Sequence, residues 1–280
     1  MIFATTRDIV CSAQDVEFII SESPEWEQAV SSGQDVFWAN NEVYADEPQK
    51  IVGGSDAKLG EFPYQVSLNY HGLHVCGGTI VSDRHIVTAA HCVDRLGNGP
   101  FKNFHVETGM VKLDSPQRKV YDVKSIRVHP EYKNEKAHSW VHDAAVITLT
   151  EPIEFNANQK PIPLATSDPP EKAPLILSGW GQLKAHGQYP NHLQKANIYH
   201  ITNQQCQKAH GNIRIFDTQL CGIQVSGIGA CQGDSGGPLA YKGQLVGIVS
   251  WVVPCARGAP DVFTRVSLYD KFVLTTDAGV

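Results

Sequence analysis

The pattern of apolar and polar positions changes at residue 51. Residues 1–50 mix acidic side chains with scattered aromatics and end in "ADEPQK", which is typical of an exposed, cleavable linker. Beyond it, short runs rich in β-branched and aromatic residues alternate with Gly and Pro turn signals. These runs cover residues 64–70, 77–81, 85–90, 104–109, 120–128, 144–150, 175–181, 196–201, 244–252 and 261–266. The pattern predicts an all-β sandwich or barrels over 51–280, with a short helix at 266–274.

Composition and charge are those of an ordinary globular protein. Of the 280 residues, 42% are hydrophobic and 19% are charged, which is enough to bury a sizeable core. The net charge of −6 is uneven, because residues 1–50 hold ten acidic and two basic residues. We therefore expect an acidic, poorly ordered leader before a nearly neutral domain. No basic run and no membrane-length apolar stretch occur, so neither nucleic acid nor a membrane is expected as a partner.

Seven cysteines indicate an oxidising compartment. Six lie beyond residue 51, and none shows the C-x-x-C spacing of a zinc site or a redox dithiol. Three disulfides, with Cys11 left over, are the better interpretation, and they predict an extracellular protein. The N-terminal stretch lacks the basic start and long apolar core of a signal peptide, so secretion is not inferred from it.

Three short motifs carry the residue types of acyl-transfer chemistry. They are "TAAHC" with His91, "HDAAVITL" with Asp143 and "GDSGGP" with Ser235. A serine hydroxyl is a weak nucleophile until a histidine can take its proton, and that histidine needs a carboxylate to orient it. The glycines around Ser235 fit the same chemistry, because the N–H groups of Gly233 and Ser235 must point at the developing oxyanion without an obstructing side chain.

These motifs belong to a longer ordered set. "IVGG", "CGGTIV", "TAAHC", "HDAAVITL", "SGWG", "GDSGGP", "SW" and "DVFTRV" follow one another between residues 51 and 266. In this order the chain resembles the chymotrypsin family of serine endopeptidases from Ile51 to about Val273, in particular invertebrate chymotrypsin- and elastase-like members. The resemblance implies two six-stranded antiparallel Greek-key β-barrels with a short C-terminal helix. It also implies His91 as general base, Asp143 as its orienting carboxylate, Ser235 as nucleophile, and Gly233 with Ser235 as the oxyanion hole.

The resemblance also implies a zymogen. In the family, cleavage before "IVGG" frees an α-amino group that pairs inside the protein with the acid preceding the nucleophile. Here the matching bond is Lys50–Ile51 and the matching acid is Asp234. Lys50 predicts a trypsin-like activating protease, and the leader 1–50 is expected to leave on activation.

Further implications of the resemblance concern cysteines, cofactors and partners. The implied disulfides are Cys76–Cys92, Cys206–Cys221 and Cys231–Cys255. Met110 stands where the family's calcium loop has an acid, and no metal or other cofactor is expected. The histidines of "HGLH", His71 and His74, are interpreted as ordinary surface or core residues. The expected partners of a monomer are protein or peptide substrates, the activating protease, and serpins or other protein inhibitors.

The primary specificity pocket is expected, by the same resemblance, within 229–235, 250–252 and 260–263. Its expected lining residues are Gly229, Ala230, Gln232, Ser250, Trp251, Val252 and Asp261. Gly229 takes the place of the aspartate that selects Lys or Arg in trypsin-like members, and Val252 replaces the glycine of wide pockets. The sequence therefore predicts cleavage after Ala, Val or Leu. The alternative is basic or broad specificity through Asp261, as in crustacean collagenase-like members.

The sequence also bears on two other function classes. A catalytically inactive homologue that serves as a binding module is disfavoured by the intact triad and oxyanion glycines. A metal hydrolase is disfavoured because the chain has no H-E-x-x-H or comparable ligand motif.

Overall fold

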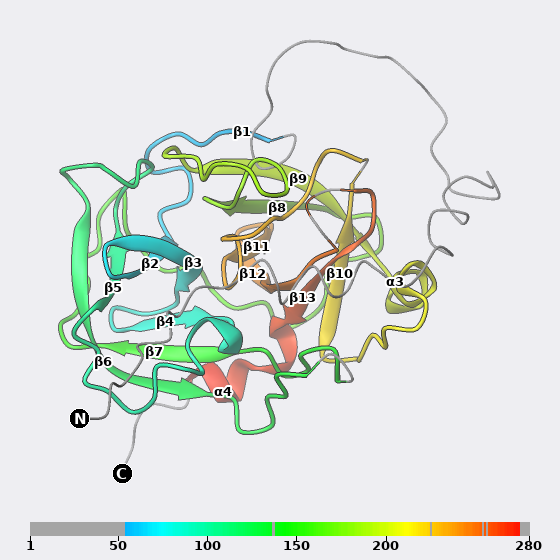
Figure 1. The fold of residues 1–280 in the computed structure, drawn as a ribbon, viewed down its shortest axis with the longest axis horizontal. Helices are drawn as coiled ribbons and strands as arrows, with labels where there is room; N and C mark the ends of the chain where they lie inside the picture. The colour runs from blue at the N-terminus through cyan, green and yellow to red at the C-terminus, as the bar shows by residue number, and fades with distance from the viewer. Residues whose placement is uncertain (1–53, 136–137, 225, 254, 256, 275–280) are drawn as a thin grey trace, which may run out of the picture.

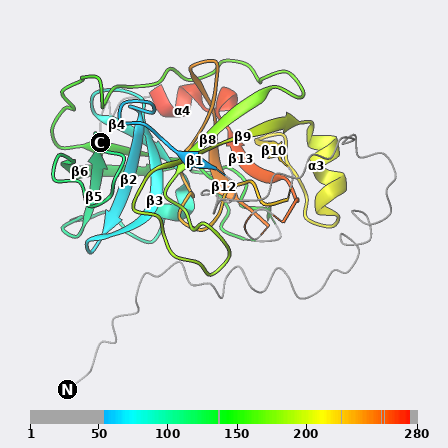
Figure 2. The same cartoon turned by 90° about the horizontal axis from the view of Figure 1, so that it is seen from above.

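The computed structural model describes residues 54–135, 138–224, 226–253, 255 and 257–274. The leader 1–50 and Ile51 lie outside the described residues, so the expectations for them stay predictions. The described chain forms two β-barrels that lie side by side (Figure 1, Figure 2). In this part of the chain no helix is long and apolar enough to cross a membrane.

The first barrel is a closed antiparallel sheet with the strand order β2, β3, β4, β7, β6, β5. Aliphatic and aromatic side chains fill its interior, and Leu68, Ile147 and Phe104 are at most 1% exposed. Burying each such side chain contributes about 1.5–3 kcal/mol, so this interior is a main source of stability. The strands are β2 (Gln65–Tyr70), β3 (Leu73–Ile80), β4 (His85–Thr88), β5 (Phe104–Thr108), β6 (Lys119–Val128) and β7 (Ala145–Leu149).

The second barrel closes in the order β9, β10, β13, β12, β11, β8, with β8 pairing back to β9. Strand β1 (Ser55–Asp56) pairs with β9 outside this ring. Side chains on β9 alternate between buried and more exposed, as expected for a strand with one face on a core. The strands are β8 (Pro174–Gly179), β9 (Gln194–Ile201), β10 (Gln219–Ile223), β11 (Pro238–Tyr241), β12 (Gln244–Trp251) and β13 (Asp261–Arg265).

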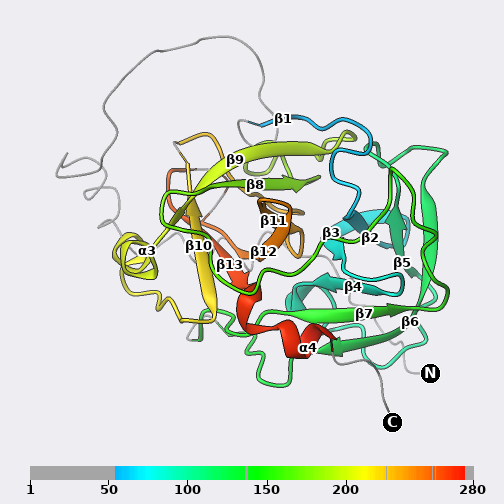
Figure 3. The same ribbon diagram turned by 180° about the vertical axis from the view of Figure 1, so that it is seen from behind.

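The C-terminal helical segment links the two barrels. After β13 the chain forms η3 (Val266–Leu268) and α4 (Asp270–Leu274), as the sequence predicts for 266–274. Helix α4 leaves the second barrel and lies beside β6 and β7 of the first (Figure 1, Figure 3). Arg127 on β6 donates to the Phe272 carbonyl at 2.8 Å, and its guanidinium stacks over the Phe272 ring at 4.7 Å. These contacts hold the barrels in a fixed relation, together with a core cluster that both barrels share.

The predicted fold class is confirmed, but four elements are missing from the sequence prediction. Strands β1, β10 and β11 lie outside the predicted runs, and so does the helix α3 (Asn203–His210). Helix α3 begins with a capping box in which Thr202 and Gln205 bind each other's backbone N–H groups.

Candidate active site

Asp143 anchors the site from the first barrel. It lies just before β7 and is 1% exposed. Its Oδ1 accepts a hydrogen bond from the backbone N–H of His91 at 2.9 Å, and its Oδ2 lies 2.8 Å from His91 Nδ1. Because an ionised carboxylate only accepts hydrogen bonds, Nδ1 carries the proton in neutral His91, and the lone pair on Nε2 is available to accept another.

His91 lies in a single 3-10 turn, η1 (Ala90–Cys92), that follows β4. A disulfide joins the next residue, Cys92, to Cys76 on β3, so the turn is tied to the barrel wall. Burial lowers the pKa of His91, but the charge of Asp143, the hydrogen bond to it and the charge of Asp94 together raise the pKa above its ordinary value. His91 therefore holds a proton more firmly than free imidazole does.

Two strands of the second barrel hold Asp143 as well. Ser250 on β12 donates its hydroxyl to Asp143 Oδ2 at 2.6 Å, and Thr264 on β13 donates to the Asp143 carbonyl at 2.6 Å. A buried carboxylate is costly unless it is hydrogen-bonded, and the Ser250 hydroxyl supplies one such donor to the side chain. The Thr264 hydroxyl holds the backbone of the same residue. The acid of the predicted triad is thus held at the junction of the two barrels.

Ser235 reaches the same junction on the loop before β11. Its carbonyl accepts a hydrogen bond from the N–H of Gly77 on β3 at 2.8 Å. A Cβ added at Gly77 would lie 2.8 Å from the Cα of Gly237, so the glycines of "CGGTIV" and "GDSGGP" let two backbones touch. A Cβ at Gly236 would likewise lie 3.0 Å from the N of Ala89, two residues before His91. The structure therefore brings the chain around Ser235 against the segment that carries His91.

The turn at Gly233 depends on a residue that the sequence prediction missed. Gly233 has a φ of 94°, a left-handed conformation that favours glycine. Its carbonyl lies 3.0 Å from Nε2 of His74, and Nδ1 of His74 lies 2.8 Å from the Ser67 hydroxyl. Burial lowers the pKa of His74 to about 4, so the ring is neutral at pH 7, donates from Nε2 and accepts at Nδ1. The sequence analysis expects His74 to be an ordinary surface or core histidine, whereas the structure shows that it contacts Gly233 across 159 positions of sequence.

Asp234 is fully buried and lies between two backbone donors. Its Oδ1 accepts from Gly181 N–H at 2.8 Å, and its Oδ2 accepts from Cys231 N–H at 3.0 Å. Added Cβ atoms at Gly179 and Gly181 would collide with this carboxylate, which accounts for both glycines of "SGWG". Burial raises the pKa of Asp234 to about 6, and the two N–H donors only partly oppose that shift. No ion pair reaches Asp234 from the described residues, and the expected partner Ile51 is not among them.

Asp261 and Gly229, which are both expected in the specificity pocket, lie against each other. The Oδ2 of Asp261 accepts from Ala230 N–H at 2.7 Å, and a Cβ at Gly229 would approach the same oxygen to 2.9 Å. Burial raises the pKa of Asp261 to about 8, Ala230 N–H opposes the rise, and the charge of Asp234 adds to it. The Asp261 carboxyl is therefore mainly neutral at pH 7.

Of the other expected pocket residues, Ser250 and Trp251 lie on β12, and Val252 follows it directly. Val252 is half-buried and packs, with Ile228 and Tyr241, against the core cluster of the second barrel. Trp251 is 9% exposed, and its ring centroid lies 5.9 Å from that of Trp140. The carbonyl of Gln232 accepts from Gln182 N–H at 2.8 Å. None of these contacts tests whether Val252 occludes the pocket, so that expectation stays a prediction.

Three disulfides brace the described domain. They join the pairs that the family resemblance implies, Cys76–Cys92, Cys206–Cys221 and Cys231–Cys255. In the chain-entropy model, loops of this length contribute about 3 kcal/mol each. The third bridge begins three residues before Asp234, so it restrains the loop that carries Ser235. Cys11 lies outside the described residues.

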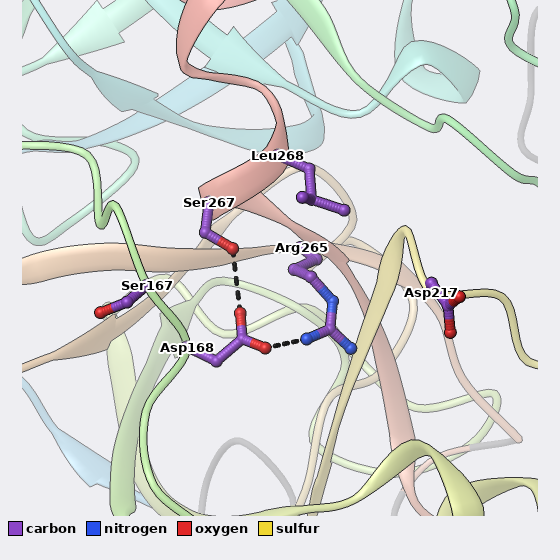
Figure 4. A pocket seen from close by; sticks show the side chains of 6 residues that line it. All are labelled: Ser167, Asp168, Asp217, Arg265, Ser267 and Leu268. Carbon is purple, nitrogen blue, oxygen red and sulfur yellow. Dashed lines mark hydrogen bonds and ion pairs between the residues drawn. The ribbon is translucent and has the colours of Figure 1, made fainter.

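A surface hollow of about 430 Å³ lies elsewhere, beside η3 (Figure 4). Asp168 in its wall forms an ion pair with Arg265 and accepts from the Ser267 hydroxyl at 2.9 Å. The Arg265 guanidinium also donates to the Gln219 carbonyl at 3.1 Å. The main hydrogen-bond donors of the hollow, those of the Arg265 guanidinium, are thus already used within the protein. The hollow is lined by none of the predicted site residues, its lining being Ser167, Asp168, Asp217, Arg265, Ser267 and Leu268.

Comparison with known proteins agrees with this geometry. The model of the family described as Trypsin matches residues 51–273. The chain belongs to the trypsin family. Chymotrypsin-2 of Vespa crabro is 38% identical over 217 residues, which are 77% of this chain and 94% of that protein. The vitellin-degrading protease of Bombyx mori is 37% identical over 234 residues, 80% of this chain and 84% of that protein.

Two further relatives come from mouse. The transmembrane protease serine 11C of Mus musculus is 38% identical over 241 residues, and the match spans 82% of this chain but only 54% of that protein. The solved structure of neuropsin, a serine protease of mouse brain, superposes with a TM-score of 0.72 and 30% identity, over 79% of this chain and 96% of that one. This trypsin-family chain is a serine endopeptidase that acts on proteins.

Proposed function

We propose that His91, Asp143 and Ser235 form the catalytic triad of this endopeptidase. Ser235 Oγ attacks the carbonyl carbon of the scissile peptide bond, and His91 Nε2 takes the hydroxyl proton and passes it to the leaving amine. Water then hydrolyses the acyl-enzyme by the reverse proton path. The observation that carries this proposal is the hydrogen bonding of Asp143 Oδ2 to His91 Nδ1 and Ser250 Oγ, which sets the tautomer of His91.

The N–H groups of Gly233 and Ser235 would stabilise the oxyanion of the tetrahedral intermediate. Within the described part of the chain, neither N–H donates a hydrogen bond to another residue. The left-handed φ of Gly233 and the contact of its carbonyl with His74 fix the direction of this turn. Two preoriented donors that have no acceptor of their own suit a charge that develops only in the transition state.

The triad is tested by replacing its nucleophile. Ser235→Ala should abolish peptide hydrolysis and labelling by a fluorophosphonate while leaving the fold unchanged, because the hydroxyl serves only covalent chemistry. Ser267→Ala is the matched control, since that hydroxyl already donates to Asp168. Turnover by Ser235→Ala within a few-fold of wild type would refute the assignment. A wild-type protein that neither reacts with the label nor cleaves peptides after activation would instead be an inactive binding homologue.

The protease is made as a zymogen that cleavage at Lys50–Ile51 activates. The support lies in Asp234, a fully buried carboxylate whose described partners are two neutral N–H groups. A buried charge without a countercharge is costly, and a new Ile51 ammonium would supply one. The loop at Gly233 and Ser235 would then be held in the oxyanion-binding shape. Lys50 matches a trypsin-like activating protease.

Cleavage after Ala, Val or Leu is the proposed specificity near neutral pH. Gly229 offers no charge, and Asp261 is mainly neutral because burial raises its pKa to about 8. Val252 would shorten the pocket, so Val252→Gly should improve kcat/KM for peptides that end in Phe or Arg relative to Leu. A methylene more or less is worth about 1–3 kcal/mol, so the preference should be graded. A clear lead for Arg or Phe in the wild-type protein at pH 7 would overturn this specificity.

Secretion and control by protein inhibitors complete the proposal. Three disulfides in one domain are typical of proteins that fold in an oxidising compartment. A monomer with an open active site is a target for serpins or other protein inhibitors. Detection of the native protein in the medium of expressing cells, with its disulfides formed, is the test of secretion.

A further inference from the structure

Three potential metal ligands meet where the β6–β7 connection begins and ends. His129 follows β6 directly, Glu131 lies two residues further on, and His142 lies immediately before Asp143. Each of the three offers a ligand atom, and these atoms all lie within 4.8 Å of one another. The sequence analysis expects no metal, because Met110 replaces the acid of the calcium loop and the chain has no H-E-x-x-H or comparable ligand motif.

The distance between His142 and Glu131 fits an intervening cation. Nε2 of His142 lies 4.0 Å from Oε2 of Glu131, which is too long for a hydrogen bond. Zinc binds imidazole nitrogen and carboxylate oxygen at about 2.0–2.2 Å, so an ion between these two atoms would need only a small contraction. The side chain of Glu131 is 73% exposed and that of His142 is 23% exposed, which leaves a path for an ion and room for a water ligand.

Aromatic neighbours orient both imidazoles. The Tyr269 hydroxyl lies 2.9 Å from His142 Nδ1, so a proton on Nδ1 that is donated to Tyr269 leaves the Nε2 lone pair facing Glu131. The His129 ring stacks on His142 with a centroid distance of 4.8 Å and an interplanar angle of 6°, and the Phe272 ring packs against its edge. Since the two imidazoles are parallel, His129 must turn about its Cβ–Cγ bond to bind the same ion, and that torsion is soft.

We propose that His129, Glu131 and His142 bind Zn²⁺, and that the bound ion slows catalysis through Asp143. Two imidazoles and one carboxylate suit zinc rather than calcium or magnesium, which prefer oxygen ligands. Three protein ligands leave a fourth position for water, an open arrangement that differs from the four protein ligands of structural zinc sites.

The route to the triad is short. The N–H of His129 donates to the Ala144 carbonyl at 3.0 Å, and the N–H of Ala144 donates to the His142 carbonyl at 2.8 Å. The two histidines therefore hold the residue next to Asp143 from both sides. An ion that draws their side chains together shifts this peptide and, with it, the 2.8 Å contact between Asp143 and His91.

Binding is tested on the full chain with zinc alone, by equilibrium dialysis after removal of metal with a chelator. One ion should bind per chain, and His129→Gln and Glu131→Gln should each weaken that site at least about tenfold. Tyr269→Phe should weaken it as well, because His142 loses its orienting partner. The matched control is His138→Gln, which removes a histidine of the same connection whose Nδ1 lies 3.0 Å from Glu135. Failure of the wild type to bind zinc, or equal loss in His138→Gln, would overturn the site.

The effect on catalysis is tested with the activated protein. Zinc should lower kcat of the wild type and of His138→Gln, and should not lower kcat of His129→Gln, each compared with its own metal-free rate. Inhibition that persists in His129→Gln would mean that zinc acts directly on His91, which would refute the proposed route. Zinc that binds without any change in kcat would also refute it. Because binding is measured without turnover, the zinc site and the proposed activation and specificity can fail independently.

Discussion

Ser250 on one barrel donates a 2.6 Å hydrogen bond to Asp143 on the other. The same carboxylate oxygen contacts His91 Nδ1, so the orientation of the histidine depends on how the two barrels pack. Asp143 is 1% exposed, which means that water does not easily replace a lost donor. The packing of the two barrels and the orientation of His91 are thereby linked.

Ser250→Ala should lower kcat/KM about tenfold or more. A hydrogen bond to a charged group contributes about 1.5–3 kcal/mol, and loss of this one leaves Asp143 less able to hold His91. The comparison variant is Ser178→Ala, since Ser178 is also buried but donates to the neutral Gln65 at 2.7 Å. That control should lose stability in thermal unfolding and keep its kcat/KM. Equal activity loss in both variants would show that general destabilisation, not the triad, is responsible.

The acid limb of the pH profile should follow His91. The pKa of His91 is raised, burial being outweighed by Asp143 and Asp94, so kcat/KM falls as the pH drops through this raised value and the base becomes protonated. Asp94→Asn removes one of the stabilising charges and should move the acid limb to lower pH. Asp122→Asn serves as control, because Asp122 pairs with His105 instead. An acid limb that stays in place in Asp94→Asn would contradict the electrostatic account.

The sequence predicts the fold where strands have strong local signals. Each of the ten predicted runs contains all or part of a barrel strand. Strands β10 (QLCGI) and β11 (PLAY) lie outside them, because each short stretch includes a Gly or Pro turn signal and at most one β-branched residue. Helix α3 was missed because it is polar and buries only Cys206 and His210, so it has no apolar period. The signal that could have found it is the Thr202-x-x-Gln205 capping box.

Local motifs also predict most residues of the candidate site, but not the residues that hold them in position. The triad residues each lie in a short ordered motif that can be found without coordinates. Ser250 and Asp143 are 107 positions apart, and His74 and Gly233 are 159 apart, so only the closed barrels bring them together. The raised pKa of Asp261 likewise follows from burial, which a sequence does not display.

Activation should change how stability depends on pH. Burial raises the pKa of Asp234 to about 6, so in the uncleaved protein ionisation of this acid is unfavourable. The folded state then binds more protons than the unfolded state between the ordinary pKa and about 6, and the stability of a Lys50→Gln protein should fall as pH rises through this window. The stability of the cleaved wild type should fall less over the same pH range, because the Ile51 ammonium favours the ionised form of Asp234.

The comparison is made by chemical unfolding of both forms between about pH 4 and pH 7. Asp234→Asn is the control. Added to the Lys50→Gln protein, it should remove the fall of stability between the ordinary pKa of an aspartate and about 6. The same Lys50→Gln protein should be nearly inactive after exposure to a trypsin-like protease. Full activity of that protein, or an identical pH dependence in cleaved and uncleaved forms, would contradict the activation mechanism.

Asp261 should make the primary specificity depend on pH. Its carboxyl lies against Gly229 in the expected pocket, and burial raises its pKa to about 8. Below that pH the neutral acid should favour Leu, and above it the ionised carboxylate should attract Arg, whose own charge does not change. The ratio of kcat/KM for matched Arg and Leu peptides should therefore rise between about pH 6 and pH 9. His91 titrates identically for both peptides, so its contribution cancels in the ratio.

The control is Asp261→Asn, in which the ratio of kcat/KM for the Arg and Leu peptides should not change with pH. A ratio that does not change with pH in the wild type would place the carboxylate out of reach of the substrate. A higher kcat/KM for Arg already at pH 6 would mean that Asp261 is ionised at that pH.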